Sequence, residues 1–220
     1  MYEPSHLLIY FYGQVVILLK KLCLMLLFSV CLNFTAGAME YTGGTSAAGC
    51  ALLDGETGRV LYQKEGDTPR PMASTTKIMT AIVALENGCL EEKVTITQES
   101  VGVEGSSLYL KEGEQLTLEE LLYGLLLESG NDAAVAIALH IGGSMEEFVG
   151  MMNQKAKELG LKQTHFENPN GLTAEGHQTT PIELGKLTAY ALQNETFAQI
   201  VSTKEKTISG GDDGQRYLTN

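Results

Sequence analysis

The segment that decides the fold reads Pro71-Met72-Ala73-Ser74-Thr75-Thr76-Lys77-Ile78-Met79-Thr80. Ser74 and Lys77 are three positions apart, so at the start of a helix their side chains lie on one face. We expect this helix to run from about Ser74 to Glu86, because Asn87-Gly88 then supplies a stop signal.

This serine–lysine pair is suited to nucleophilic catalysis. A serine hydroxyl is a weak nucleophile until a base takes its proton. A lysine can act as that base when burial or nearby positive charge lowers its pKa. Met72, Ile78 and Met79 flank the pair, which indicates that Lys77 is not freely solvated. The competing interpretation is an N-cap serine beside a solvated lysine, because this spacing alone is common.

A second polar element, Ser129-Gly130-Asn131, interrupts two apolar helical stretches at residues 121–127 and 133–139. Polar groups in so apolar a setting need hydrogen-bond partners. A loop aimed into a cleft would supply them. A plain connection between two helices, with Asp132 capping the second, explains the triplet equally well.

Outward from these motifs, the pattern predicts strands at both ends of the chain and helices between them. Turn residues at 54–58 separate two apolar runs, which favours a β-hairpin. Three N-caps open later helices: Thr117 with Glu120, Ser144 with Glu147, and Thr180 with Pro181 and Glu183. We expect further strands at 93–97, 201–208 and 215–220, and irregular structure at 98–116. This order is typical of an α/β layer fold.

Composition narrows the classes of function. The chain has 220 residues, of which 44% are hydrophobic, and a formal net charge of -12. This length suits one domain or most of a larger one. The excess of acidic residues repels phosphates, so nucleic-acid binding is excluded. His140, His165 and His177 lack the spacing of metal ligands, so we expect no metal site and no cofactor.

The N-terminus resembles an export signal. Lys20 and Lys21 precede an apolar stretch at 22–34, and Ala36-Gly37-Ala38 offers small residues for cleavage. We therefore expect a signal peptide at 1–38, with residues 1–19 from a start codon assigned too far upstream. An uncleaved anchor helix is the alternative, although the stretch is short for a membrane span of about 20 residues. Residues 39–46 then form a linker, and 47–220 form the catalytic part.

Two cysteines, Cys50 and Cys89, follow the expected cleavage site, which is too few for a disulfide scaffold. Ala48-Gly49-Cys50 faintly resembles a lipoprotein cleavage site. Cys50 also falls within an expected strand, and a free cysteine packs as a small hydrophobic residue. We therefore interpret Cys50 as a core residue.

Together, these segments resemble the serine D-Ala-D-Ala carboxypeptidases, the low-molecular-mass penicillin-binding proteins of peptidase family S11. The resemblance extends from about Ala47 to Asn220. It rests on four stretches: Leu53 to Tyr62 as the opening hairpin, Ala73 to Lys77 as the nucleophile motif, Leu127 to Ala134 as the second motif, and Phe166 to Leu172 followed by His177. It implies a β-lactamase/DD-peptidase-like α/β fold, with an antiparallel sheet and a helical block.

The resemblance also implies a role for each motif residue. Ser74 would attack the carbonyl between two D-alanines of a peptidoglycan stem peptide, and Lys77 would take its proton. Ser129 would relay a proton to the leaving D-alanine, while Asn131 would hold Lys77 and the substrate amide. β-Lactams would acylate Ser74 as inhibitors. The protein would act outside the cytoplasm, in the cell envelope, with membrane or cell-wall association left open.

One departure from the family concerns its third motif, Lys-Thr-Gly on a strand. Lys206-Thr207-Ile208 begins in the same way but lacks the glycine and comes too early. Residues 217–220 resemble the segment that precedes the true motif in relatives. We therefore expect the catalytic domain to be incomplete in this sequence, with its last strands missing.

Two other functions compete with this one. A class A β-lactamase shares the Ser-x-x-Lys motif, but it needs a glutamate in a Glu-x-x-Leu-Asn loop, and residues 167–171 lack that pattern. An inactive cell-wall-binding fragment would explain the missing third motif. Nitrocefin turnover would distinguish the first alternative, and the reading frame after codon 220 the second.

Overall fold

The computed structural model describes residues 44–220, so the expected signal peptide and its cleavage site lie outside the described residues. In chain order the elements are β1 (Cys50–Leu53), β2 (Val60–Lys64), the 3₁₀ helix η1 (Ala73–Thr76), α2 (Lys77–Asn87), β3 (Lys93–Thr95), the 3₁₀ helix η2 (Gln98–Ser100), β4 (Gln115–Thr117), α3 (Leu118–Leu127), α4 (Asn131–Gly142), α5 (Met145–Glu158), α6 (Pro181–Ala191), α7 (Glu195–Ser202), β5 (Glu205–Ser209) and β6 (Gln215–Thr219).

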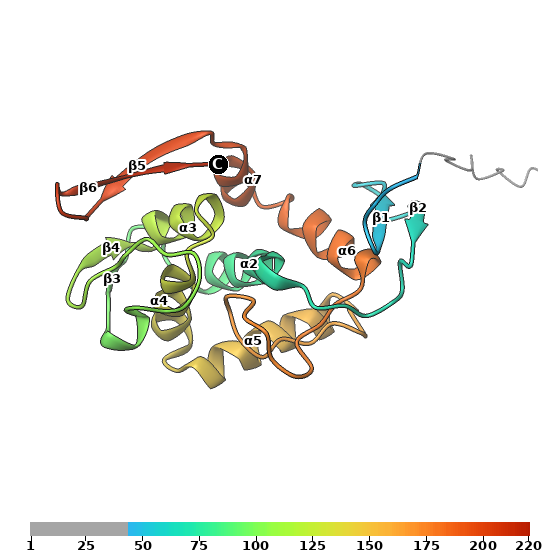
Figure 1. The fold of residues 1–220 in the computed structure, drawn as a ribbon, viewed down its shortest axis with the longest axis horizontal. Coiled ribbons are helices and arrows are strands. Elements are labelled where there is room, and N and C mark those ends of the chain that lie inside the picture. The colour runs from blue at the N-terminus through green and yellow to red at the C-terminus, as the bar shows by residue number, and fades with distance from the viewer. Residues whose placement is uncertain (1–43) are drawn as a thin grey trace, which may run out of the picture. The chain divides into compact units, whose positions relative to one another are not determined.

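Helix α2 is the centre of the helical block and packs against α3, α4, α5 and α6 (Figure 1). Every residue from Met79 to Ala84 is at most 1% exposed. A helix that is covered on all sides is held by its neighbours rather than by its own propensity. Lys77 is the first residue of this buried helix, so packing of the helix also shields the lysine from solvent.

The expected caps define the helices around α2. Thr117 and Glu120 form a complete capping box at α3, with each side chain bonded to the other residue's backbone N–H. Thr180 accepts a hydrogen bond from the Glu183 N–H at α6. At α5 the Ser144 hydroxyl accepts a hydrogen bond from the Glu147 N–H, but the Glu147 carboxylate does not accept one from the Ser144 N–H. These helix starts were therefore predicted correctly, although the α5 box is only half formed.

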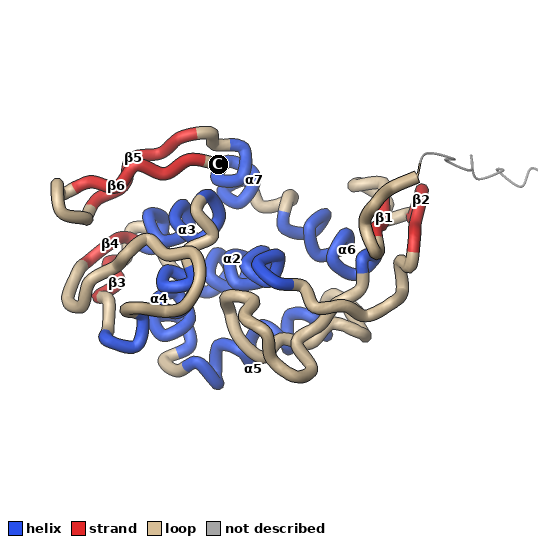
Figure 2. Tube along the Cα trace, in the orientation of Figure 1, coloured by secondary structure: helices blue, strands red, loops and turns tan. Residues whose placement is uncertain are grey.

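The strands form three separate antiparallel hairpins, β1–β2, β3–β4 and β5–β6 (Figure 2). The antiparallel pairing is as expected. Within residues 44–220, however, no strand of one hairpin pairs with a strand of another, so the expected single sheet is three two-stranded sheets. Within residues 44–220, the helices therefore form the extended layer that carries the Ser74–Lys77 pair and Asn131.

Several expected boundaries were wrong. Residues 73–76 form a 3₁₀ turn before α2, so the α-helix starts at Lys77 rather than Ser74. Residues 98–116 are not wholly irregular, because η2 and the start of β4 lie there. The run 201–208 is not one strand, since Val201 and Ser202 end α7. A β-branched run predicted a strand there, but burial of Phe197 and Ile200 against the core fixes a helix instead.

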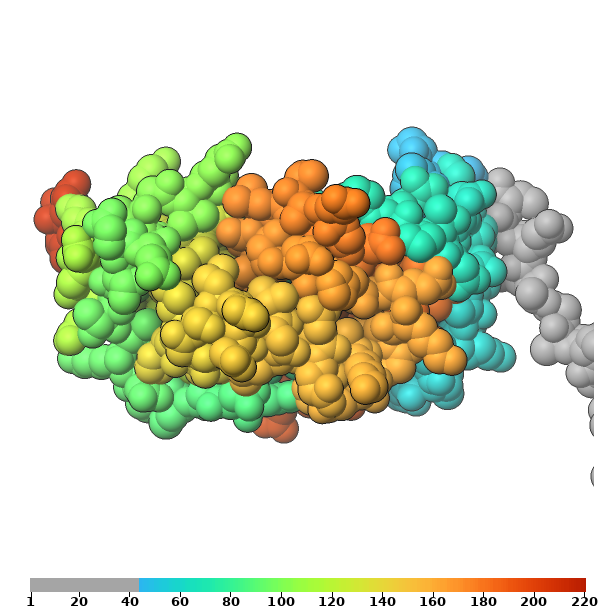
Figure 3. Space-filling view, turned by 90° about the horizontal axis from the view of Figure 1, so that it is seen from below, coloured from blue at the N-terminus to red at the C-terminus, as the bar shows by residue number. Residues whose placement is uncertain are grey.

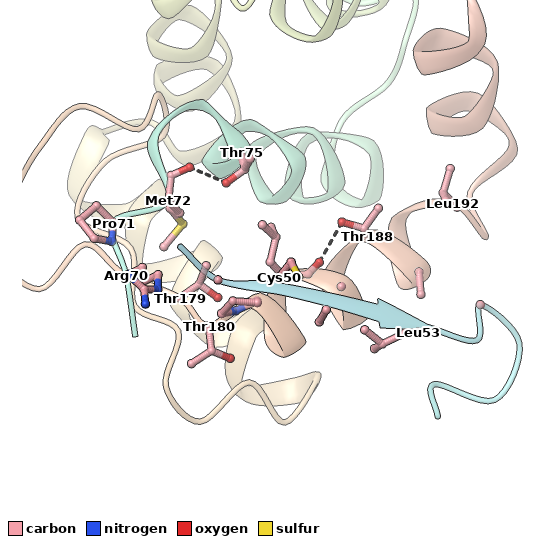
Figure 4. Close-up of a pocket in the computed structure, with 17 residues that line it drawn as sticks. Cys50, Leu53, Arg70, Pro71, Met72, Thr75, Thr179, Thr180, Thr188 and Leu192 are labelled. Carbon is pink, nitrogen blue, oxygen red and sulfur yellow. Dashed lines mark hydrogen bonds between the residues drawn. The ribbon is translucent and has the colours of Figure 1, made fainter. Parts of the chain in front are cut away.

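An apolar groove of about 600 Å³ lies between β1 and α6 (Figure 4). Cys50 is in β1 as expected, but it is half-buried and lines this groove, so the prediction of a core cysteine was wrong. Met72 and Thr75 reach one end of the groove, whereas neither Ser74 nor Lys77 lines it. The groove is therefore distinct from the site that contains the serine–lysine pair.

Candidate active site

Ser74 lies in η1, at the N-terminal end of α2, and its side chain is exposed. The preceding residue, Ala73, has a φ of 45°, a left-handed conformation that non-glycine residues rarely adopt. Such strain persists only where surrounding contacts hold it. The start of a helix also favours negative charge, which a reacting serine oxygen develops. The local backbone is thus built to present this hydroxyl.

Lys77 is 2% exposed and makes three contacts from its Nζ. The distances are 2.6 Å to Asn131 Oδ1, 2.7 Å to the carbonyl oxygen of Asn170 and 3.4 Å to Ser74 Oγ. A charged ammonium donates to all three. A neutral amine donates two hydrogen bonds, and the two amide oxygens can only accept. The lone pair of the neutral amine is therefore left for the hydroxyl of Ser74.

Burial lowers the pKa of Lys77 from 10.5 to about 8, while the charge of Asp132 opposes this shift. With a pKa of about 8, roughly a tenth of the lysine is neutral at pH 7. The prediction that Lys77 is not freely solvated is confirmed. Because the base is partly unprotonated near neutral pH, the pair can transfer a proton from Ser74 to Lys77.

Asn131 is held so that its amide oxygen faces Lys77. Its Nδ2 donates to the Glu104 carbonyl at 2.6 Å, and its backbone N–H donates to the Ser106 carbonyl at 2.7 Å. Asp132 does not cap α4 as a plain helix connection would require, because the N-cap is Gly130 and no side chain caps the helix. Asn131 is therefore the first residue of α4, and its side chain contacts Lys77.

Ser129 is placed differently from the other three expected site residues. It has a φ of 56°, and its Oγ is buried without a hydrogen-bond partner among residues 44–220. A buried hydroxyl without a partner is uncommon in folded proteins. Hydrogen bonds thus connect Ser74, Lys77 and Asn131, whereas the Ser129 hydroxyl, two residues before Asn131, bonds to none of them.

The loop between α5 and α6 closes the site from another side. In Figure 3 this loop, in orange, lies between the green residues that precede β4 and the teal residues that precede η1. Gly171 has a φ of 91°, and a Cβ there would lie 2.0 Å from the Ala73 carbonyl oxygen. Thr80 Oγ1 donates to the Pro169 carbonyl at 2.6 Å. The loop is therefore packed directly against the nucleophile turn.

Three contributors were not predicted from the sequence. The Asn170 carbonyl holds Lys77, and a backbone carbonyl leaves no residue-type signal. Asp132 is 1% exposed, and its carboxylate accepts hydrogen bonds from the Leu108 and Leu110 N–H groups. His177 is 5% exposed and contacts Thr76. Burial of the polar side chains of Asp132 and His177 would have marked them as site residues. Burial cannot be read from the sequence, because it depends on contacts between residues far apart in the chain.

A family model described as D-alanyl-D-alanine carboxypeptidase matches residues 37–218. The chain belongs to this family, peptidase family S11. The family resemblance expected from the motifs is therefore confirmed, and Ser74, Lys77, Ser129 and Asn131 all lie within the matched residues.

Two curated relatives illustrate how much of the family's length is present. The D-alanyl-D-alanine carboxypeptidase DacF of Bacillus subtilis is 40% identical over 179 residues, which cover 79% of this chain and 46% of DacF. The D-alanyl-D-alanine carboxypeptidase of Streptomyces sp. is 39% identical over 189 residues, covering 79% of this chain and 65% of the relative. The chain thus spans about half to two thirds of the length of these S11 relatives.

Solved structures agree with this assignment. The D-alanyl-D-alanine carboxypeptidase from Mycobacterium tuberculosis superposes with a TM-score of 0.77 at 32% identity, over 81% of this chain and 67% of that one. A mutant of a Streptomyces DD-transpeptidase gives a TM-score of 0.75 at 36% identity, over 81% and 75% of the two chains. The expected α/β DD-peptidase-like fold is confirmed.

Two further searches concern only the residues that the structure describes. No group of three His, Cys, Asp or Glu side chains is arranged to hold a metal ion in residues 44–220. In the same residues, no helix is both long and apolar enough to cross a membrane.

Proposed function

We propose that this S11 chain belongs to a serine D-alanyl-D-alanine carboxypeptidase that removes the terminal D-alanine of peptidoglycan stem peptides. The observation that carries the proposal is the buried Lys77 amine, held by two amide oxygens with its remaining position directed at Ser74. A desolvated lysine beside an exposed serine suits a nucleophilic hydrolase, and the family match points to D-alanyl-D-alanine as the substrate. Penicillins, which imitate the acyl-D-Ala-D-Ala unit, would react with the same hydroxyl.

The reaction begins with neutral Lys77. Its lone pair takes the proton of Ser74 as Oγ forms a bond to the carbonyl carbon between the two D-alanines, and the carbonyl oxygen becomes an oxyanion. The backbone N–H of Ser74 would stabilise that oxyanion. The C–N bond then breaks, and the D-alanine nitrogen leaves with one proton. Water finally cleaves the acyl ester and restores the Ser74 hydroxyl.

Ser129 and Asn131 are proposed to assist these steps. The Ser129 hydroxyl is buried and without a partner in residues 44–220, which suits a group that passes a proton between Lys77 and the leaving nitrogen. The Asn131 amide already holds Lys77 through Oδ1. A substrate amide would compete for the remaining capacity of this side chain, which would couple substrate binding to the position of the lysine.

We propose that residues 47–220 are one part of the catalytic domain. The chain covers 46% of the DacF relative, and its 220 residues contain no Lys-Thr-Gly triplet. Lys206 does not supply that motif's lysine, because its Nζ lies 4.2 Å above the ring of Tyr123. A second oxyanion donor would come with the missing strand, and one such donor is worth about 100- to 1,000-fold in rate.

The proposed place of action is outside the cytoplasm, in the cell envelope, where peptidoglycan is built. The export signal at residues 1–38 carries this proposal, and Ala36-Gly37-Ala38 would be its cleavage site. Mass spectrometry of the exported protein should find Met39 as the first residue. A cellular protein that retains Met1 would contradict the proposal without affecting the chemistry of Ser74.

Labelling by fluorescent penicillin tests the proposed chemistry. Three proteins are compared: residues 39–220, a form extended through the Lys-Thr-Gly strand, and the extended form with Ser74→Ala. We expect strong labelling of the extended form, weak labelling of the short form and none of the variant. Labelling that survives Ser74→Ala would refute the proposed nucleophile. Fast turnover of nitrocefin instead of a stable adduct would favour a β-lactamase.

A further inference from the structure

His177 connects the loop before α6 to the turn that carries Ser74. Its Nε2 lies 2.7 Å from Thr76 Oγ1, and its Nδ1 lies 3.0 Å from the backbone nitrogen of Glu167. The ring is 5% exposed and meets the ring of Phe166 edge to face, at 6.0 Å and 76°. Both ring nitrogens are therefore used, and the orientation of the ring is fixed from three directions.

These contacts determine which nitrogen carries the proton. The Glu167 backbone nitrogen can only donate, so Nδ1 of His177 must accept. In the neutral ring the proton then sits on Nε2, which donates to Thr76 Oγ1. Thr76 Oγ1 in turn donates to the Ala73 carbonyl at 2.7 Å. A directional chain of hydrogen bonds thus runs from Glu167 through His177 and Thr76 to Ala73.

The end of this chain is the strained residue beside the nucleophile. Ala73 has a φ of 45°, and its carbonyl receives Thr76 while Gly171 packs against it too closely for any Cβ. Left-handed backbone at a non-glycine residue is strained and needs contacts that hold it. The His177–Thr76 chain and the close approach of Gly171 are the contacts that meet this need.

We propose that His177 is a positioning residue for the nucleophile, whose neutral ring holds the strained turn that presents Ser74 through Thr76. This inference rests on the proposed role of Ser74. His177 touches neither Ser74 nor Lys77 in any hydrogen bond, so it acts through the backbone geometry of the turn and not on the reacting atoms. A misplacement of about 1 Å can cost roughly 100-fold in rate.

Protonation of His177 would break the chain at its first link. A second ring proton on Nδ1 would face the N–H of Glu167, so two donors would oppose each other. Burial lowers the pKa of His177, the Glu167 carboxylate opposes that shift, and a charge on His165 would reinforce it. The charged group nearest to Thr76 in the η1–α2 segment is the amine of Lys77, the next residue in the sequence. The pKa of His177 therefore lies below the ordinary histidine value, which favours the neutral ring.

The first test follows the backbone amides of Ala73 and Ser74 by NMR while the pH is varied from about 5 to 8. We expect both amides to shift together with the His177 ring, with a midpoint below 6.5. Thr76→Val should leave the ring titrating but uncouple the two amides from it. His165→Gln is the matched control, because His165 is an exposed histidine of the same loop, and it should leave the coupling unchanged.

A second variant keeps the test decisive if Thr76→Val fails to fold. His177→Gln retains a neutral amide donor near Nε2, so both amides should stop titrating while the spectrum stays folded. The proposal would be overturned if, in the unsubstituted protein, the Ala73 and Ser74 amide shifts did not change as the His177 ring titrates. Amides that still titrate in folded His177→Gln would also overturn it.

Acylation separates this inference from the proposed function. In the extended form, His177→Leu should slow penicillin labelling by about 100-fold. His177→Gln should stay near the unsubstituted rate and lose the additional decline caused by protonation of His177, so that only the decline caused by protonation of Lys77 remains. If His177→Leu labels as fast as the unsubstituted protein, the positioning role is wrong even though Ser74 is acylated. If the unsubstituted extended form is never labelled, the proposed function fails, while the NMR coupling still decides whether His177 holds the turn.

Discussion

The helical block and the terminal hairpins of this S11 chain are held in different ways. In the block, one side chain, that of Lys77, bonds both to the start of α4 and to the loop before α6, and Thr80 adds a second bond to that loop. The β5–β6 hairpin instead bonds mainly within itself. It is attached to the rest through Ile208 and Leu218, which pack in the core, and through polar anchors, chiefly Arg216 on Glu114 just before β4. Buried hydrogen bonds thus connect the nucleophile half of the site, whereas the hairpin is held by two core side chains and by polar anchors.

The largest effect is expected from removing the base. Lys77→Met keeps an unbranched side chain in the buried space but removes the amine, so penicillin acylation of the extended form should fall by about 100- to 10,000-fold. Stopped-flow labelling would measure this loss. Lys157→Met, on the exposed side of α5, is the matched control and should not change the rate. Equal rates for Lys77→Met and the unsubstituted protein would exclude Lys77 as the base.

The Arg216–Glu114 anchor of the β5–β6 hairpin should affect the stability of the protein but not the pKa of Lys77. Arg216 is 9% exposed and forms two hydrogen bonds with the Glu114 carboxylate, at 2.6 and 2.8 Å. Arg216→Ala leaves that carboxylate unpaired, so the free energy of unfolding should fall by about 3–5 kcal/mol in urea titrations. The double variant with Glu114→Gln should recover part of the loss. A loss below about 1 kcal/mol would mean that this pair behaves as a surface salt bridge.

The pH dependence of the acylation rate is a smaller effect, and it should depend on Lys77 in the helical block but not on Arg216 in the hairpin. With a Lys77 pKa of about 8, the neutral fraction, and hence the rate, should rise about tenfold from pH 7 to a plateau above pH 9. Arg216 is always charged in this range, so a folded Arg216→Ala protein should keep the same midpoint. A midpoint that moves with Arg216→Ala would show that the hairpin and the block are not independent.

Helix capping gives the smallest predicted effect. Thr117→Ala removes both hydrogen bonds of the Thr117 hydroxyl, one accepted from the Glu120 N–H and one donated to the Glu120 carboxylate, and should lower the free energy of unfolding by about 1 kcal/mol. Ser144→Ala breaks a single bond at α5 and should cost less. Thermal unfolding followed by circular dichroism would rank the two. The reverse order would mean that the bond from the Thr117 hydroxyl to the Glu120 carboxylate contributes nothing.

The sequence predicted what local patterns determine. Thr117 with Glu120 and Thr180 with Pro181 set helix starts through residues three or fewer positions apart. The Ser74–Lys77 pair was found for the same reason. The partners of Lys77 were only partly foreseen, because Asn131 carries a motif whereas the Asn170 carbonyl, 93 positions away, does not. Long-range contacts of this kind depend on the packed fold.

The hairpins were predicted less well. Alternating apolar residues identified β1 and β2, but they could not say whether β1 pairs with strands from the other end of the chain. The segment 201–208 combines β-branched residues with an amphipathic pattern, and packing of Ile200 in the core decided in favour of α7. Sheet partners and helix–strand boundaries of this type are set by tertiary packing, which single-sequence patterns do not contain.

The most direct test of the account is the pKa of the Lys77 amine, measured by NMR on the Nζ and Cε nuclei of residues 39–220. This measurement needs no substrate and no further strand. We expect a midpoint of about 8, and a simultaneous shift of the Asn131 side-chain amide, because its Oδ1 accepts from the same nitrogen at 2.6 Å. A midpoint near 10.5, the ordinary value for lysine, would contradict the claim that the helical block alone prepares Lys77 to activate Ser74.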